Sequence, residues 1–228
     1  MGEKYNGSDV LDLMQSAKRY NNYLASLCEE LVKAKNTKIV DFGAGIGTIS
    51  EIIAQKGFNI ECIELDDEQR QVIQNKGLQA HEDLTYLDDG SVDMFISFNV
   101  FEHIKDDKEQ MKIIYNKLKQ GGKFLFFVPA FSCLYSSFDK RLGHCRRYDL
   151  SIAQNLVEDC GFTINNYKYF DSLGFCLALV YKIFNRNGQI SKYSINMYDK
   201  IIFPLTLIFD KIFNKYFGKN IVMVLSKD

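Results

Sequence analysis

The 228-residue chain lacks several features that would assign it to a class of proteins at once. It has no excess of positive charge: 28 basic and 29 acidic residues give a net charge of −1, whereas nucleic-acid-binding domains usually carry a basic excess. No apolar run approaches the ~20 residues of a membrane span. Its first ten residues, MGEKYNGSDV, hold no apolar core of a signal peptide. We therefore expect a cytoplasmic protein that does not bind nucleic acid.

Metal-binding and nucleotide-loop patterns are missing too. Six cysteines are scattered without a CxxC pair, and this is typical of buried or inert thiols in a reducing cytosol. The sequence therefore predicts no metal site. It also contains no repeat, no low-complexity tract and no Walker-type loop ending in Gly-Lys-Ser/Thr.

What the chain does contain is a regular alternation of short apolar strands with amphipathic helices. We expect strands at 37–42, 58–65, 78–83, 91–99 and 123–129, separated by helices at 48–57, 66–77 and 106–122. Mostly apolar strands that alternate with helices predict a parallel sheet covered on both faces. In such sheets ligands bind at the carboxyl ends of the strands.

The rest of the chain follows a different pattern. A helix is predicted after Ser8 and another at 150–161, with a sixth strand at 162–171 and a seventh at 220–227. Between these last strands come apolar helical stretches at 173–184 and about 195–217, where Pro204 should kink or divide the helix. We expect one domain, 1–228, made of a helical lid (1–36), a core (37–171), a helical cap (172–218) and a last strand (219–228).

The second stretch of the cap has an apolar stripe and an opposite polar face. The stripe comprises Tyr198, Ile201, Ile202, Leu205, Ile208, Phe209, Ile212, Phe213 and Tyr216. The polar face comprises Asp199, Thr206, Asp210, Asn214 and Lys215. The pattern favours a cap packed on the sheet by its stripe. A tunnel for an apolar acceptor, a dimer interface and a membrane-surface patch are the alternatives.

The segment DFGAGIGTIS, residues 41–50, places three glycines after the first strand. Gly43 and Gly45 match the first two glycines of a dinucleotide fingerprint, but Thr48 stands where the third is required. Glu64 ends the second strand, where its carboxylate can accept hydrogen bonds from both hydroxyls of a ribose. These residues predict a nucleoside ligand and leave nicotinamide dinucleotides open.

Taken together, VDFGAGIG, IEL, EDL and VDMFISFNVFEHI resemble the class I S-adenosylmethionine-dependent methyltransferases over residues 38–130. The resemblance implies an α/β fold with a doubly wound, seven-stranded, mostly parallel sheet and S-adenosyl-L-methionine as cofactor. The segment FDKRLGHCRRYDL also resembles a subgroup with a Gly-His-x-Arg-Arg-Tyr element. Members of that subgroup are often associated with saccharide, lipid or secondary-metabolite assembly.

The resemblance also implies a set of cofactor-binding residues. They are Asp41, Gly43, Ala44, Gly45 and Gly47 for the methionine portion, Glu64 and Leu65 at the ribose, Asp83 and Leu84 at the adenine, and Asn99 and Val100 beside the sulfonium. Tyr20 on the leading helix either closes over the cofactor carboxylate or is a core aromatic residue.

Candidate catalytic and acceptor-binding residues lie in two segments. Histidine suits removal of a hydroxyl proton near neutral pH, so His103 and His144 are the candidate bases. Arg146 and Arg147 can grip a phosphate or carboxylate, or else brace the fold through carbonyl groups. Tyr148 joins them as an acceptor-binding candidate, with a core position as its alternative.

These residues predict an S-adenosylmethionine-dependent methyltransferase that methylates an oxygen of a small or lipid- or saccharide-linked acceptor. A nicotinamide-dependent oxidoreductase and a non-catalytic protein that binds a nucleoside cofactor are the alternatives. The sequence leaves peripheral membrane contact and the oligomeric state open.

Overall fold

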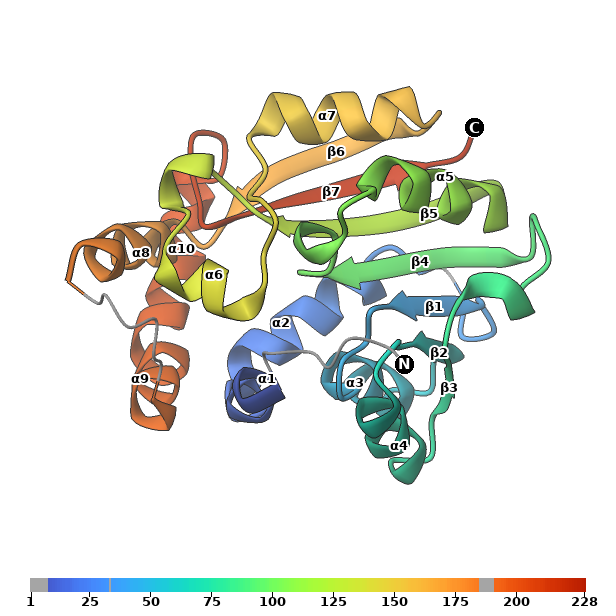
Figure 1. Cartoon of the computed structure of the whole chain (residues 1–228), viewed down its shortest axis with the longest axis horizontal. Helices are drawn as coiled ribbons and strands as arrows, with labels where there is room; N and C mark the ends of the chain where they lie inside the picture. The colour runs from blue at the N-terminus through green and yellow to red at the C-terminus, as the bar shows by residue number, and fades with distance from the viewer. Residues whose placement is uncertain (1–7, 33, 185–190) are drawn as a thin grey trace.

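The computed structural model describes residues 8–32, 34–184 and 191–228. A seven-stranded sheet crosses the molecule with strand order β3-β2-β1-β4-β5-β7-β6 (Figure 1). Its strands are β1 (Ile39–Phe42), β2 (Ile60–Ile63), β3 (Gln79–His81), β4 (Val92–Phe98), β5 (Leu118–Pro129), β6 (Thr163–Phe170) and β7 (Asn220–Ser226). The strands β1 to β5 pair in parallel, and β7 runs antiparallel between β5 and β6. The predicted seven-stranded, mostly parallel sheet is confirmed.

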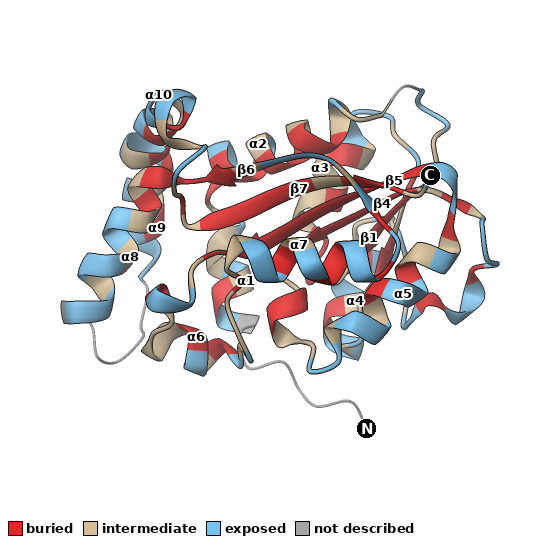
Figure 2. Ribbon diagram, turned by 90° about the horizontal axis from the view of Figure 1, so that it is seen from above, coloured by how far each residue is buried: buried red, intermediate tan, exposed pale blue. Residues whose placement is uncertain are grey.

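Helices cover both faces of this sheet, as Figure 2 shows from above. One face packs against α5 (Asp107–Lys117) and α7 (Leu150–Asp159), and the other against α2 (Lys18–Glu29) and α3 (Thr48–Gln55). Successive residues of β5 point to opposite faces. Phe124 and Phe126 therefore join the first core, while Leu125 and Phe127 join the second. The helix α4 (Asp67–Asn75) connects β2 to β3.

Two predicted helix boundaries are wrong. The leading helix is divided into α1 (Ser8–Met14) and α2, because the Ser16 hydroxyl donates to the Leu13 carbonyl at 2.6 Å and Ala17 has a non-helical ψ of 64°. The helix predicted at 106–122 ends at Lys117, and β5 begins at Leu118. Competition from strand pairing explains this end, since Leu118 already pairs with Val92 of β4.

The segment between β6 and β7 is helical, as predicted. It contains α8 (Ser172–Phe184), α9 (Lys192–Met197), the π-helical turn η4 (Tyr198–Ile202) and α10 (Phe203–Phe213). Pro204 lies in the first turn of α10, directly after the π-helical turn. The hydrogen-bonding pattern changes there, but the backbone stays helical from α9 into α10, so the predicted kink or division stays a prediction. In Figure 1 these helices stand at the left of the molecule, beyond the carboxyl ends of β4 and β5.

The apolar stripe of this segment does not face the sheet. Ile195 and Phe203 pack into the core, but Asp199, Thr206 and Asp210 are buried while most of the stripe is exposed. The prediction that the stripe packs on the sheet is therefore wrong.

The buried aspartates explain this orientation, because the starts of neighbouring helices have backbone N–H groups without helical partners. The Asp199 carboxylate accepts from the N–H groups of Arg19 at 3.2 Å and Tyr20 at 2.9 Å, in the first turn of α2. The Asp210 carboxylate accepts from the N–H groups of Asp171 at 2.8 Å and Ser172 at 2.9 Å, at the start of α8. Asp199 and Asp210 therefore cap helices that are distant in the sequence, and these contacts turn the polar face of the cap segment towards the core.

This capping role predicts that Asp210→Ala destabilises the protein. The substitution leaves two buried N–H groups at the start of α8 without a partner, and such a loss costs about 1–3 kcal/mol per group. We expect a lower free energy of unfolding in urea titrations. Asp88→Ala, which removes an exposed carboxylate, is the control and should leave stability within about 0.5 kcal/mol. Equal stability of the two variants would contradict the capping role.

Candidate functional site

The glycine turn after β1 brings backbone unusually close to other parts of the chain. Gly43, Gly45 and Gly47 all adopt positive φ, at 76°, 57° and 71°, a region that favours glycine. A Cβ on Gly43 would lie 2.4 Å from a methyl carbon of Val100, and one on Gly47 would lie 3.0 Å from Ile73. The backbone N–H groups of Gly43 and Ala44 donate to the Ile63 carbonyl at 2.9 and 3.0 Å. These contacts hold the turn against the end of β2.

Two carboxylates flank this turn. One oxygen of Glu64, directly after β2, accepts from the Gly45 N–H at 2.8 Å, and the other accepts from the Asp66 N–H at 3.0 Å. Asp41 is buried in β1 and accepts a hydrogen bond from the Ser50 hydroxyl. Burial raises the pKa of Asp41 to about 7, and it also raises the pKa of Glu64. The turn therefore brings backbone N–H groups and two carboxylates together at one edge of the sheet.

The other predicted cofactor residues lie at the ends of β3 and β4. Asp83 caps the 3-10 turn η1 (Leu84–Tyr86) by accepting from the Thr85 N–H at 2.7 Å; its side chain is exposed, whereas Leu84 is buried. Asn99 follows β4 with a positive φ of 55°, and Val100 lies against Gly43. Because β3, β2, β1 and β4 are parallel neighbours, all these residues lie at the same edge of the sheet. Leu65 is exposed beside Glu64.

This edge fits a nucleoside cofactor with a polar tail. The three glycines have no side chain at the turn, and Glu64 places a carboxylate beside Gly45. Gln69 of α4 adds a feature that the sequence analysis missed: it is buried beside Gly45, and its Nε2 has no hydrogen-bond partner among the described residues. The sequence signal for Gln69 was its position in the first turn of the predicted helix, three residues after the N-cap residue Asp66. Leu11 of α1 also lies close to Gly45.

Tyr20 lies in an aromatic cluster of the core. Its ring centroid is 5.5 Å from that of Phe203 and 6.0 Å from that of Phe170, and the residue is buried. Burial raises the pKa of its hydroxyl, followed by the charges of Asp171 and Glu102. This placement favours the core alternative over a lid on the cofactor.

The two candidate bases meet in space. His103 belongs to the 3-10 turn η2 (Phe101–His103) after β4, and His144 follows α6 (Ser137–Leu142). Their ring centroids are 4.6 Å apart, with nearly perpendicular planes. The Cys145 N–H donates to the Glu102 carbonyl at 2.7 Å and so ties the GHCRRY segment to the end of β4. The fold therefore joins the two motifs that carried the predicted chemistry.

His144 is oriented by a buried carboxylate. Its Nδ1 lies 2.9 Å from Oδ1 of Asp139, which the Arg147 Nε also contacts at 2.8 Å. Burial alone would raise the pKa of Asp139, but the His144 hydrogen bond and the Arg147 charge hold it well below its usual range. An ionised carboxylate only accepts hydrogen bonds, so Nδ1 carries the proton. The Asp139 contact thus fixes the ring through Nδ1, and Nε2 is the ring nitrogen outside this contact.

His103 has a different environment. Burial, and then the His144 ring, lowers the pKa of His103 to about 4. Its imidazole is therefore neutral near pH 7 but weakly basic. Efficient general bases have a pKa near the working pH, so this lowered pKa argues against His103 as the base.

Glu102, which the sequence analysis did not select, completes this cluster. It is fully buried, and neither carboxyl oxygen has a hydrogen-bond partner among the described residues. Its Oε1 is 3.9 Å from Nε2 of His144. Burial raises the pKa of Glu102 to about 8, so the carboxyl group is mainly protonated at neutral pH. The acidic residue within NVFEHI was the signal available in the sequence.

Arg146, Arg147 and Tyr148 are engaged by the protein itself. Arg147 also donates to the Ala130 carbonyl at 3.2 Å, and Arg146 pairs with Asp107 at 2.5 Å and the Lys105 carbonyl at 2.8 Å. Tyr148 is fully buried with its hydroxyl 2.7 Å from the Asp107 carboxylate. These contacts favour the bracing alternative over acceptor binding for all three.

The cluster also has the composition of a cation site. Glu102, His103 and His144 each offer one ligand atom, and these atoms lie within 4.8 Å of one another. The Arg147 charge acts on the same carboxyl group and opposes a second cation there. The expectation of no metal stays a prediction.

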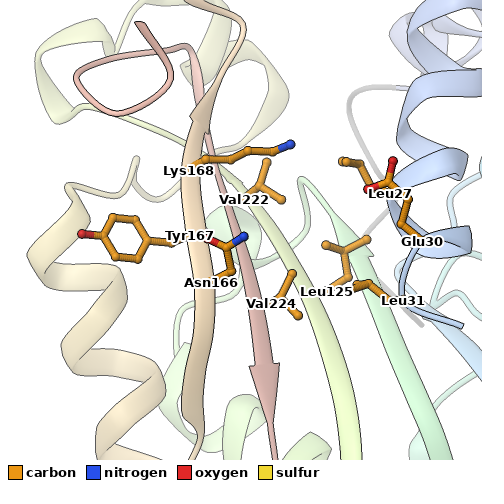
Figure 3. A pocket seen from close by; sticks show the side chains of 9 residues that line it. All are labelled: Leu27, Glu30, Leu31, Leu125, Asn166, Tyr167, Lys168, Val222 and Val224. Atoms are coloured by element: carbon orange, nitrogen blue, oxygen red, sulfur yellow. The ribbon is translucent and has the colours of Figure 1, made fainter. Parts of the chain in front are cut away.

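A separate small pocket lies between α2 and the strands β5, β6 and β7. Figure 3 shows its lining side chains, among them Leu27, Glu30, Lys168 and Val222. Its volume of about 110 Å³ is well below the roughly 300–1,000 Å³ of ligand pockets. None of its lining residues belongs to the predicted site.

The buried Glu102 predicts a pH dependence of stability. Its folded pKa of about 8 lies above the reference value of 4.5, so the native state retains a proton that the unfolded chain releases. This contribution to stability is complete below about pH 4.5 and is lost as the pH rises towards about 8, by at most about 1.4 kcal/mol per pH unit. Glu102→Gln should therefore gain stability relative to wild type across this range.

Urea titrations at several pH values would measure this difference. The exposed Glu109→Gln is the matched control and should follow the wild-type profile. Parallel profiles for Glu102→Gln and wild type would contradict a buried, protonated Glu102.

Comparisons with known proteins agree with this geometry. A family model described as a methyltransferase domain matches residues 16–166. Two curated relatives are ubiquinone biosynthesis O-methyltransferases. The one from Idiomarina loihiensis is 28% identical over 99 residues, 39% of this chain and 41% of the relative. The one from Pseudomonas entomophila is 25% identical over 108 residues, 43% and 47%. The chain spans less than half the length of the curated relatives it matches.

Solved structures show the same fold. An S-adenosylmethionine-dependent methyltransferase from Thermotoga maritima is 15% identical with a TM-score of 0.64, covering 96% of this chain and 95% of its own. Phosphoethanolamine N-methyltransferase 2 from Haemonchus contortus, solved with S-adenosyl-L-methionine, is 18% identical with a TM-score of 0.61, covering 90% and 52%. The oxidoreductase and non-catalytic alternatives are set aside by the family match. The chain belongs to the methyltransferase domain family and has the fold of S-adenosylmethionine-dependent methyltransferases.

Proposed function

We propose that this methyltransferase transfers the methyl group to a hydroxyl oxygen of a small or lipid- or saccharide-linked acceptor, with His144 as the base. The observation that carries the proposal is the Asp139–His144 pair at 2.9 Å, which orients the imidazole through Nδ1 and leaves Nε2 outside that contact. A hydroxyl must lose its proton as the new bond to carbon forms, and a positioned imidazole can accept it.

The position of this pair supports the proposal. Val100, which lies against Gly43, directly precedes η2, and the rings of Phe42 and Phe101 are 5.9 Å apart. Glu102 and His103 follow within the same turn, and the His103 and His144 rings are in contact. The base is therefore joined to the cofactor edge by a few residues of packed chain.

Each predicted cofactor residue has a proposed role at this edge. The roles are the methionine portion for Asp41, Gly43, Ala44, Gly45 and Gly47, the ribose for Glu64 and Leu65, the adenine for Asp83 and Leu84, and the sulfonium for Asn99 and Val100. When bound, S-adenosylmethionine supplies an electrophilic methyl group on a positively charged sulfur. The chain aligns the acceptor for an in-line displacement, and such alignment can lower a barrier by roughly 7–11 kcal/mol in favourable cases.

The choice of oxygen rests on two weaker observations. The curated relatives are named as O-methyltransferases, although at 28% and 25% identity. The GHCRRY segment, which resembles the subgroup linked to saccharide, lipid or secondary-metabolite assembly, supplies His144. We propose that this segment braces the base through Arg147 and Asp139 and meets the acceptor through His144.

We further propose that residues 1–36 act as a lid. Leu11 of α1 lies close to Gly45, and Asp9 of the same helix pairs with Arg141 of α6. The helix α1 therefore connects the glycine turn with the segment that carries Asp139.

Close approach at the glycine turn predicts the effect of Gly43→Ala. The new methyl group would overlap Val100 and distort the turn. At 100 times its dissociation constant, S-adenosylhomocysteine should stabilise the folded wild type by about 2.7 kcal/mol, and the substitution should abolish most of this stabilisation. Gly57→Ala is the matched control, because Gly57 has a similar φ of 84° but open space around it. Ligand-induced shifts in melting temperature would be compared, and equal shifts for both variants would contradict the site.

The base assignment predicts that His144→Ala lowers turnover by about 10²–10⁴-fold. Affinity for S-adenosylhomocysteine, measured by calorimetry, should change little. Turnover would be followed as S-adenosylhomocysteine release with a panel of catechols, phenols and sugar nucleotides. Normal turnover of His144→Ala with an acceptor that wild type methylates would contradict the assignment.

A matched substitution and a metal control sharpen this test. His103→Ala should lower turnover less than His144→Ala, because burial lowers the pKa of His103 to about 4 and makes it the weaker base. Wild type should also keep its activity after dialysis against a chelator. Loss of activity that added Mg²⁺ or Zn²⁺ restores would instead assign Glu102, His103 and His144 to a metal site.

A further inference from the structure

The stripe that faces away from the sheet forms an apolar surface on the outside of the cap. We call it the outer stripe: Ile201, Leu205, Ile208, Phe209, Ile212 and Tyr216. Each of these side chains is between 42% and 71% exposed. Their spacing returns to one side of the helix at every turn. An exposed apolar surface of this kind usually marks an interaction site.

Neighbouring helices add exposed apolar residues at the same end of the molecule. They are Leu177, Leu179, Val180 and Ile183 of α8, and Tyr193 and Met197 of α9. The helices α8 and α10 pack against each other, and α9 continues through η4 into α10 (Figure 2). The apolar surface is therefore shared by the helices of the cap.

The exposed charges within the described part of the cap have one sign. Lys200, Lys211 and Lys215 are exposed in and just after the helix that carries the outer stripe, and Lys182 and Lys192 are exposed on α8 and α9. The acidic residues of the described cap, Asp199 and Asp210, are both buried as helix caps. Within the described part of the cap, no carboxylate therefore offsets these lysines at the surface.

We propose that the outer stripe and its lysines dock on an anionic lipid bilayer surface. Lysines beside exposed Leu, Ile, Phe and Tyr side chains are the composition of helices that lie in a membrane interface. Apolar side chains enter the boundary between head groups and acyl chains, while lysines contact anionic head groups. No helix within the described residues is long and apolar enough to cross a membrane, so the contact lies along the surface.

The charge pattern separates this proposal from its rivals. In a symmetric dimer built on this stripe, the lysines of both copies would crowd one interface without exposed carboxylates from the cap to offset them. A tunnel for an apolar acceptor would need the stripe to line an interior, and the stripe faces outward. An anionic surface satisfies both the apolar side chains and the lysines.

The place of this surface gives the proposal a consequence for the enzyme. The cap stands beyond the carboxyl ends of β4 and β5, the edge that also carries the cofactor and base residues (Figure 1). Docking there would hold that edge near the bilayer. The proposal goes beyond the methyl-transfer function, since it is tested by binding without an acceptor.

Vesicle co-sedimentation of the full chain would test the proposal. Vesicles of phosphatidylcholine alone are compared with vesicles that also contain phosphatidylglycerol, at low and high salt. We expect binding only with phosphatidylglycerol, weakened by salt because surface charges are screened. Ile208→Glu should weaken binding roughly tenfold or more, since a charge replaces an isoleucine that would enter the bilayer. Lys211→Glu should weaken it by about fivefold or more.

Matched variants outside the cap control for general charge and folding effects. Ile152→Glu on α7 removes an isoleucine of similar exposure, and Lys112→Glu on α5 reverses an exposed lysine. Both should bind vesicles like wild type. Melting temperatures of all variants establish that they fold, and Lys211→Glu keeps the test valid if Ile208→Glu does not fold.

Several outcomes would overturn the proposal. They are absence of vesicle binding, equal binding to neutral vesicles, and equal losses in the α7 and α5 variants. Sedimentation velocity without lipid adds one more: a dimer that Ile208→Glu dissociates would assign the outer stripe to a second copy of the chain.

Discussion

The need to satisfy buried carboxylates determines how the parts outside the sheet are placed. Moving an ionised carboxylate out of water costs several kcal/mol unless hydrogen bonds or an opposite charge compensate. Asp139 meets this need with His144 and Arg147, whereas Asp199 and Asp210 meet it with backbone N–H groups of α2 and α8. The same constraint therefore orients the candidate base and turns the cap so that its apolar stripe faces solvent.

Glu102 shows what happens where no partner is available. Its two oxygens have no hydrogen bond among the described residues, and burial raises its pKa to about 8. The group stays mostly neutral instead of carrying an unpaired charge. Two acidic residues, 2.9 Å and 3.9 Å from nitrogens of the same imidazole, thus exist in different protonation states, because among the described residues Asp139 has hydrogen-bond partners and Glu102 has none. Such divergence of neighbouring carboxyl groups is typical of sites that move protons.

The sheet brings the residues of the candidate site together at one edge. Parallel strands end at one edge, so residues far apart in the chain meet there without any direct bond between them. Glu64 follows β2, Asn99 follows β4, and the glycine turn follows β1. The antiparallel β7 then lets the chain leave this edge for the cap and return through the sheet. The cap and the site therefore share one end of the molecule.

Local patterns in the sequence determined where the strands lie along the chain, the glycine turn and the family resemblance. Glycine at positive φ and apolar strands of period two are properties of short segments, so they can be read without a structure. The contact between NVFEHI and GHCRRY, the roles of Arg147 and Asp139, and the buried Glu102 depended on how the segment after α6 meets the turn η2 that follows β4. The amphipathic pattern of 195–217 was visible, but it could not say which face turns inward. That choice was made by two aspartates that cap distant helices, because a buried N–H group must find an acceptor wherever the fold provides one.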